Sequence, residues 1–285
     1  MQDDDIRRQK RREKIRKKKR LKLMFYGTVA VVVVLVVVII IAVSAGGGNK
    51  KTSGDDIASI GPTVPGEDAT IAPLLLDYDY TKPVPETTEI DDSYFSHALF
   101  VGDARLQCFE LYSFLGNADI LSGSGVSVSN IMNYEFGYNG GVTTLGTLLA
   151  TKQYDSIYLM FGLNELGWEN NDVFASSYGI LVDDIKMRQP DAMIYAHLII
   201  PVTAEKSGNP SYISNERIAV YNGLISAMCA EKGIYFLDLS AAMCETGGNL
   251  NAAYATDGIQ FNMDGTTVWY NYLKNHTVSK EKYRN

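Results

Sequence analysis

The chain has 285 residues, 46% of them hydrophobic and 21% charged, and its formal net charge is −7. This is enough apolar material for one well-buried domain with appendages. The three cysteines, Cys108, Cys229 and Cys244, cannot all pair and show no metal-ligand spacing, which excludes a disulfide-built fold and a cysteine zinc site.

The basic residues gather at the N-terminus, where residues 1–22 hold twelve Lys and Arg against four acids, a net charge of +8. Subtracting +8 from −7 leaves −15 for the remaining chain. Leu23–Val43 follows without a charged residue, and as a helix it would rise about 31 Å, enough to cross a bilayer. We expect a transmembrane helix at 23–43, with the basic segment 1–22 in the cytoplasm and the rest outside.

Two alternatives apply to this N-terminal region. A cleaved signal peptide would use the small residues of Val43-Ser44-Ala45, but its apolar core normally runs about 7–15 residues and this one is longer, which favours an uncleaved anchor. A nucleic-acid arm would explain the basic run. Its position beside a spanning helix is better explained by orientation and attraction to anionic lipid, so no nucleic-acid partner is expected.

A linker follows the predicted anchor. Residues 46–92 hold five of the eight prolines, ten acids and only three bases, a composition that cannot bury enough apolar surface to fold. The sequence therefore predicts an extracellular disordered linker over 44–92. Leu74–Leu76 is able to pack on the domain, so the last third of this linker is expected to be partly ordered.

The pattern then alternates between strand and helix from residue 93 to residue 276, followed by a tail over 277–285. Such alternation predicts a three-layer α/β/α sandwich with a flavodoxin-like parallel sheet of about five strands. The expected strands are short apolar runs typical of buried parallel strands, at Ala98–Val101, Ala118–Leu121, Ile157–Phe161, Met193–Ile200 and Ile234–Leu237. The expected helices contain Phe174–Ile185, Ile218–Met228 and Thr266–Asn275, with stops at Gln189-Pro190 and Lys232-Gly233.

Three polar segments lie at or near predicted strand ends. Gly102-Asp103-Ala104 ends the first strand, Gly162-Leu163-Asn164-Glu165 ends the third, and Asp257-Gly258-Ile259-Gln260 lies near the C-terminus. Ligands of open parallel sheets bind beyond the carboxyl ends of the strands, so these segments are expected to meet there.

Together the three segments resemble the Gly-Asp-Ser, Gly-x-Asn-Asp and Asp-x-x-His blocks of the SGNH (GDSL-type) hydrolases. The resemblance implies that Ala104 stands where the family has its nucleophilic serine, and Gln260 where it has its catalytic histidine. Asp257 matches the triad acid. The oxyanion and ligand-binding positions would be Gly125 and Asn164, with Asp103 and Glu165 beside them, and the resemblance implies no metal and no cofactor.

Other residues are weaker candidates for chemistry. Cys108 lies one helical turn beyond Ala104, where it is expected to face packing. His97, His197 and His276 are too scattered to suggest a metal site, and His197 is expected to be a hydrogen-bonded core residue. Gly123-Ser124-Gly125 is expected to be a turn. Four aromatic residues are candidates either for a ligand groove or for peripheral packing: Tyr134, Phe136, Tyr138 and Trp168.

Three functional hypotheses follow. The first is a membrane-anchored bacterial surface pseudoenzyme that binds an acylated envelope glycan or an envelope partner protein. The second is a working esterase, deacetylase or acyltransferase of the SGNH family that acts on cell-surface carbohydrate esters. The third is a structural partner in an envelope complex. Losing both the nucleophile and the base favours the first, because triad residues act as a unit.

Overall fold

The fold is known from a computed structural model, which describes residues 77–113, 115–209 and 211–279. The predicted basic segment, spanning helix and most of the predicted linker lie outside these residues. Within them, no helix combines the length and the apolar character needed to span a bilayer.

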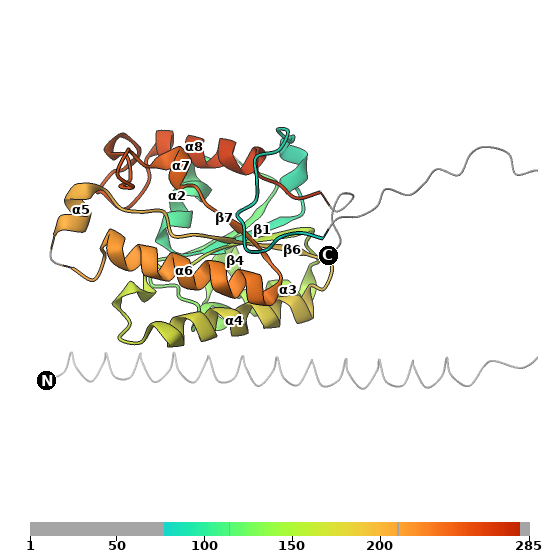
Figure 1. Ribbon diagram of the computed structural model, residues 1–285. Helices are drawn as coiled ribbons and strands as arrows, with labels where there is room; N and C mark the ends of the chain where they lie inside the picture. Colours follow the sequence, from blue (N-terminus) through green and yellow to red (C-terminus); the bar gives the residue numbers. More distant parts are fainter. Residues whose placement is uncertain (1–76, 114, 210, 280–285) are drawn as a thin grey trace, which may run out of the picture. The chain divides into compact units, whose positions relative to one another are not determined.

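A five-stranded parallel sheet forms the centre of the domain (Figure 1). Its strands, in spatial order, are β2 (Asp119–Ser122), β1 (Ala98–Gly102), β5 (Ser156–Met160), β6 (Met193–His197) and β7 (Tyr235–Leu237). Every residue of the three central strands is buried, because helices cover both faces. This explains why these strands read as unbroken apolar runs.

Helices cover the sheet in two layers (Figure 1). One layer holds α3 (Leu145–Thr151), α4 (Asn171–Arg188) and α6 (Asn215–Lys232), and the other holds α2 (Ala104–Tyr112), α7 (Ser240–Met243) and α8 (Met263–Lys274). A further short helix, α5, spans Ala204–Gly208, and a hairpin joins β3 (Phe136–Tyr138) to β4 (Gly141–Thr143). Four 3₁₀ helices complete the description: Asp92–Phe95, Ile131–Asn133, Glu165–Gly167 and Ala252–Tyr254. The predicted three-layer sandwich is confirmed.

Local sequence determines where these helices begin and end. The side chains of Asn170, Ser214 and Asn262 accept bonds from the first-turn N–H groups of α4, α6 and α8. Gly233 ends α6 in the left-handed conformation, with φ of 59°.

The predicted strand Met193–Ile200 is longer than β6, which ends at His197. Beyond that point the side-chain amide of Asn222 binds both backbone groups of Ile199, at 2.7 Å to its N–H and 2.9 Å to its carbonyl oxygen. Side-chain bonds therefore replace the sheet ladder there. The β3–β4 hairpin and α3 were not predicted.

The packed unit extends beyond the predicted limits of 93 and 276. Val84 is buried and its N–H donates to the Phe236 carbonyl on the edge strand β7, at 2.9 Å. Tyr78 and Tyr80 contact the ring of Tyr235. At the other end, the N–H of buried Val278 donates to the Tyr195 hydroxyl at 3.1 Å. The last part of the predicted linker thus covers a sheet edge.

Candidate functional site

The first element of the site is the junction between β1 and α2. Asp103 caps α2, its carboxylate accepting from the Arg105 N–H at 2.9 Å, and its own N–H donates to the Met160 carbonyl at the end of β5. Gly102 is required there, since a Cβ would lie 2.6 Å from the Met160 oxygen. Ala104 is the first residue of α2 and is half-buried. A methyl group therefore occupies the helix start, where no side-chain atom can attack a substrate.

The loops after β2 and β5 meet beside this junction. The Gly123 N–H donates to the Gly102 carbonyl at 3.3 Å, and the Asn164 side-chain amide donates to the Val126 carbonyl at 2.8 Å. Gly125 takes φ of 75°, which a residue with a side chain rarely adopts. The structure thus brings the predicted positions Gly125 and Asn164 together with the start of α2.

Glu165 lies beneath the surface of the site. One carboxylate oxygen accepts from the Val128 N–H at 2.7 Å and the other from the Gly162 N–H at 3.0 Å. Burial raises the pKa of this carboxyl to about 7, because it penalises the charged form, although the backbone donors oppose the shift. Glu165 braces two loops and is not open to a ligand. The same holds for buried Asp103, whose pKa burial raises to about 6.

The loop after the 3₁₀ helix Ala252–Tyr254 holds the remaining predicted residues. Exposed Asp257 accepts from the N–H groups of Ile259 and Gln260, at 2.9 and 2.7 Å. The Gln260 side-chain oxygen accepts from the Cys108 thiol on α2 at 3.4 Å. Asp257 and Gln260 are therefore adjacent, as in the Asp-x-x-His pattern, and Gln260 reaches the helix that begins at Ala104. An amide at this position cannot accept a proton near neutral pH.

Arg105 joins the two halves of the site and was not predicted. Its buried guanidinium donates to the carbonyls of Ile200, Ile259 and, at 3.2 Å, Pro201. It also lies over the Phe261 ring, 5.0 Å from the centroid. Burial lowers its pKa to about 10, so it stays charged at neutral pH. In the sequence, Arg105 resembles any basic residue in the first turn of a helix. The only signal that could have identified it is its position directly after Gly102-Asp103-Ala104.

The three histidines lie in three different surroundings. Exposed His97 pairs with Asp155 at 3.2 Å, at the amino ends of the strands, and His276 stacks on Tyr272 after α8. His197 is buried at the end of β6, where burial lowers its pKa to about 3. It was expected to be hydrogen-bonded, but neither ring nitrogen has a hydrogen-bond partner among the described residues. Its nearest aromatic contact is Trp269, which packs edge-on with the two ring centroids 5.3 Å apart.

The three cysteines lie in buried or half-buried positions. All three are free thiols whose pKa burial raises, to about 12 for Cys229 and about 11 for Cys244. Cys108 is the one beside the site, and its thiol is engaged with Gln260. A protonated thiol is a poor nucleophile.

The four aromatic candidates pack on the core. Phe136 is buried, and the other three lie partly buried against the same core cluster. The Tyr134 hydroxyl donates to the Ser124 carbonyl at 3.2 Å, and the Tyr138 hydroxyl donates to Asp119 at 2.6 Å. These contacts favour peripheral packing over a ligand groove.

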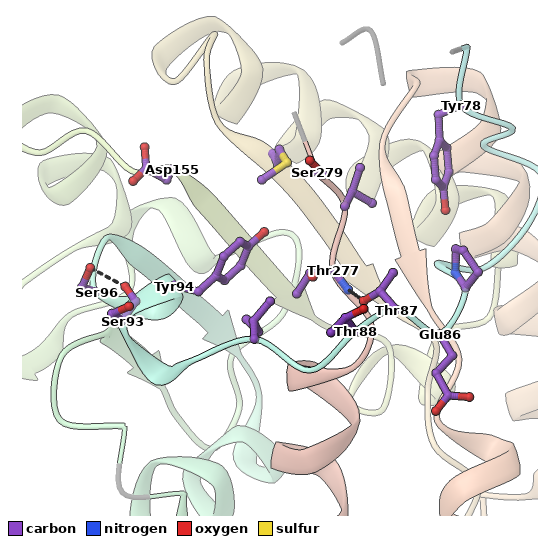
Figure 2. Close-up of a pocket in the computed structure, with 14 residues that line it drawn as sticks. Tyr78, Glu86, Thr87, Thr88, Ser93, Tyr94, Ser96, Asp155, Thr277 and Ser279 are labelled. Atoms are coloured by element: carbon purple, nitrogen blue, oxygen red, sulfur yellow. Dashed lines mark hydrogen bonds between the residues drawn. The ribbon is translucent and has the colours of Figure 1, made fainter. Parts of the chain in front are cut away.

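A cavity of about 990 Å³ lies elsewhere (Figure 2). Its lining includes Ser96, Asp155 and Met193, which mark the amino ends of β1, β5 and β6, together with Tyr78 and Ser279 near the ends of the described chain. A second cavity, of about 460 Å³, lies between α4 and α6. Neither contains a residue of the predicted site. We therefore place the candidate site by its chemistry at the carboxyl ends of the strands.

Comparison with known proteins identifies a family whose sequence model matches more than half of the chain. The sequence model of the GDSL-like Lipase/Acylhydrolase family matches residues 106–268. Among solved structures, the chain is similar to a GDSL-like lipase from Bacteroides thetaiotaomicron, with 14% identity, 66% of this chain and 89% of that one covered, and a TM-score of 0.49. It is also similar to a catalytic mutant of an acetylxylan esterase from Geobacillus stearothermophilus, with 15% identity, 67% and 94% covered, and a TM-score of 0.46. No curated protein matches the chain.

Proposed function

The chain belongs to the GDSL-like lipase/acylhydrolase family, and from this premise we propose that it is a membrane-anchored surface protein that binds an acylated glycan without hydrolysing it. The observation that carries the proposal is the pair of side chains at the reacting positions. Ala104 begins the helix where attack would start, and Gln260 occupies the position of the base.

Catalysis by this site would need an oxygen or sulfur nucleophile and a group to take its proton. Within the described residues, the nearest thiol is that of Cys108, and burial raises its pKa. The one histidine at the carboxyl ends of the strands, His197, is buried and neutral. Residues that act as a unit lose most of their effect when one is absent, and here two are absent.

The remaining dipoles favour binding of a carbonyl group. The start of α2, the Gly125 turn and the Asn164 amide lie together, and such donors stabilise the partial negative charge on a carbonyl oxygen. Exposed Asp257 nearby would repel an anion. A neutral ester, such as an acetylated sugar, therefore suits the site better than a free carboxylate.

The expected location supports a glycan as the carrier of the acyl group. The charge pattern of residues 1–22 and the uncharged run 23–43 predict that the domain lies outside the cell. Acylated polysaccharides of the envelope would then be its accessible ligands.

The test of lost chemistry is restoration of the two side chains. The full-length protein and its Ala104→Ser/Gln260→His variant are compared for hydrolysis of a short activated acetyl ester. We expect the unmodified protein to remain at background and the variant to gain at least about 10³-fold over it, the order of triad contributions. Activity of the unmodified protein well above background would contradict the proposal, since another residue would then carry the reaction.

Binding is tested separately by calorimetry with an O-acetylated glycan oligosaccharide and the same oligosaccharide after chemical deacetylation. We expect heat of binding with the acetylated form only. Equal binding of both forms would mean that the sugar, and not the acetyl group, is recognised. Binding of neither form would contradict glycan binding.

A further inference from the structure

The side-chain amide of Gln260 is hydrogen-bonded at one end only. Its oxygen accepts from the Cys108 thiol at 3.4 Å, whereas its nitrogen has no acceptor among the described residues. That nitrogen is not one of the buried unpaired atoms of the described chain, so it is open to solvent. An amide nitrogen carries two N–H donors and no acceptor. Gln260 therefore presents two unused donors at the position matched to the family's base.

The Cys108 thiol determines which end of this amide faces away from α2. Burial raises the pKa of the thiol, although the Phe261 backbone N–H acts in the opposite direction, so the sulfur keeps its hydrogen at neutral pH. Because that backbone N–H faces the sulfur, the thiol hydrogen is left for the Gln260 oxygen. An amide rotated by 180° would turn its own N–H groups towards this donor. The oxygen of Gln260 thus stays towards Cys108 and the nitrogen away from it.

The contact with Cys108 places Gln260 against the face of α2 that begins at Ala104. Ala104 and Cys108 are four residues apart and lie on the same side of the helix, whose side chains lean towards its N-terminal end. Asp257 does not hold the side chain of Gln260, because within the described residues its carboxylate accepts from the backbone N–H groups of Ile259 and Gln260. The open nitrogen therefore lies on the side of α2 where a ligand of the candidate site would bind.

A donor at this position distinguishes two kinds of acyl group. In acyl transfer the base returns its proton to the leaving atom, so a side chain at its position faces the atom that joins the acyl group to the sugar. The bridging oxygen of an O-acyl ester accepts a hydrogen bond, whereas the bridging N–H of an N-acyl amide can only donate. Beside the Gln260 nitrogen an ester gains a hydrogen bond, and an amide sets two donors against each other.

We propose that Cys108 orients the Gln260 amide so that its nitrogen donates to the bridging oxygen of an O-acylated ligand and rejects an N-acylated one. The inference rests on the proposed function and deepens it. An N-acetyl group offers the same carbonyl oxygen to the Gly125 turn and the Asn164 amide as an O-acetyl group does, so those donors do not separate the two. Gln260 is the specificity-determining residue, and Cys108 is its positioning residue.

Calorimetry on the full-length protein tests the discrimination. The O-acetylated oligosaccharide is compared with an isostere in which N–H replaces the bridging oxygen. We expect the ester to bind at least about tenfold more tightly, because the isostere leaves facing donors unpaired. Equal binding of the two would overturn this inference and leave the proposed function standing. Binding of neither would contradict both.

Gln260→Glu reverses the hydrogen-bonding character of the side chain at constant shape. Both oxygens of an ionised glutamate accept, and one is still able to accept from the Cys108 thiol. At pH 8, where a glutamate is ionised, the variant should bind the ester at least about tenfold more weakly than the unmodified protein does and should prefer the N–H isostere. An unchanged ratio of the two dissociation constants would overturn the role of Gln260.

Two substitutions of Cys108 test its positioning role. Cys108→Ser keeps a hydroxyl donor and should retain the preference for the ester. Cys108→Val removes the donor at similar volume and should reduce the preference to less than about threefold, because the amide is then free to offer either its oxygen or its nitrogen. The ratio of the two dissociation constants is the readout, since a general disturbance of the fold would weaken both ligands alike. Full preference in Cys108→Val would show that the thiol does not orient the amide.

Discussion

Arg105 has the largest expected effect of any single residue near the site. Its guanidinium binds three carbonyls from two loops while buried. Arg105→Met should remove these bonds and leave buried acceptors unpaired, lowering the free energy of unfolding by about 3–5 kcal/mol. Arg105→Lys keeps the positive charge but loses the planar set of N–H donors, so it should lower the free energy of unfolding by less than Arg105→Met does. Urea unfolding of the three proteins measures this, and a loss below about 1 kcal/mol for Arg105→Met would contradict the role.

His197 should make stability depend on pH. The pKa of its imidazole is about 3 in the folded protein and 6.5 in the unfolded chain, where the ring is exposed to water. Between these two values the unfolded chain binds a proton that the folded chain does not. This contribution destabilises the fold as pH falls from 6.5 towards 3, by about 2 kcal/mol at pH 5. The raised pKa values of Asp103 and Glu165 act in the opposite direction, because those folded carboxyls bind protons first.

His197→Phe isolates this contribution, because the two carboxyls remain in both proteins. The difference in unfolding free energy between the unmodified protein and the variant, measured by urea titration from pH 7.5 to pH 5, should shift by about 2 kcal/mol towards the variant. Parallel pH profiles would show that His197 does not titrate as its burial implies.

At the scale of elements, the conformation of the loop after β5 depends on one glycine. Gly162 takes φ of 122°, and a Cβ there would lie 2.4 Å from the Ile199 side chain. Gly162→Ala should therefore cost about 2–4 kcal/mol of unfolding free energy. Gly223→Ala on α6 is the control, because a Cβ there meets nothing within 4 Å and should stabilise the helix slightly. Thermal unfolding of both variants distinguishes them, and equal effects would contradict the account.

Much of the fold could be predicted from the sequence, for physical reasons. Buried parallel strands leave continuous apolar runs, and the ends of α4 and α6 carry Gln189-Pro190 and Gly233. The β3–β4 hairpin escaped prediction because its strands have three residues each, with Gly137 inside one and Gly141 starting the other. Such short strands leave no alternation to detect.

Within the site, the topology of a parallel sheet predicted that the polar segments lie together. It did not predict which of their side chains are buried. Asp103 and Glu165 look like exposed ligand-binding acids in sequence, but their carboxylates bind backbone N–H groups beneath the surface. Arg105 was missed for the same reason, since a buried charge is recognised only by partners that lie far away along the chain.

At the scale of the whole molecule, residues 77–92 should contribute to stability. Val84 is 2% exposed, and Tyr78 and Tyr80 cover Tyr235. A chain beginning at residue 93 should therefore unfold at least about 5 °C below one beginning at residue 77, since burial of one such apolar side chain is worth about 1.5–3 kcal/mol. Val84→Asp in the full-length protein should reproduce part of the loss. Coinciding melting curves for the two shorter chains would contradict the packing.

The positions of the two ends of the described domain have a practical consequence. Tyr78 and Ser279 both lie at the amino ends of the strands, and Ala104 follows the carboxyl end of β1 (Figures 1 and 2). A fluorescent reporter, an immobilisation tag or a sensor surface joined at either end of the described domain would thus attach on the far side from the loops of the candidate site. Under the proposed function, the domain is therefore suited to display as a capture reagent for acylated glycans.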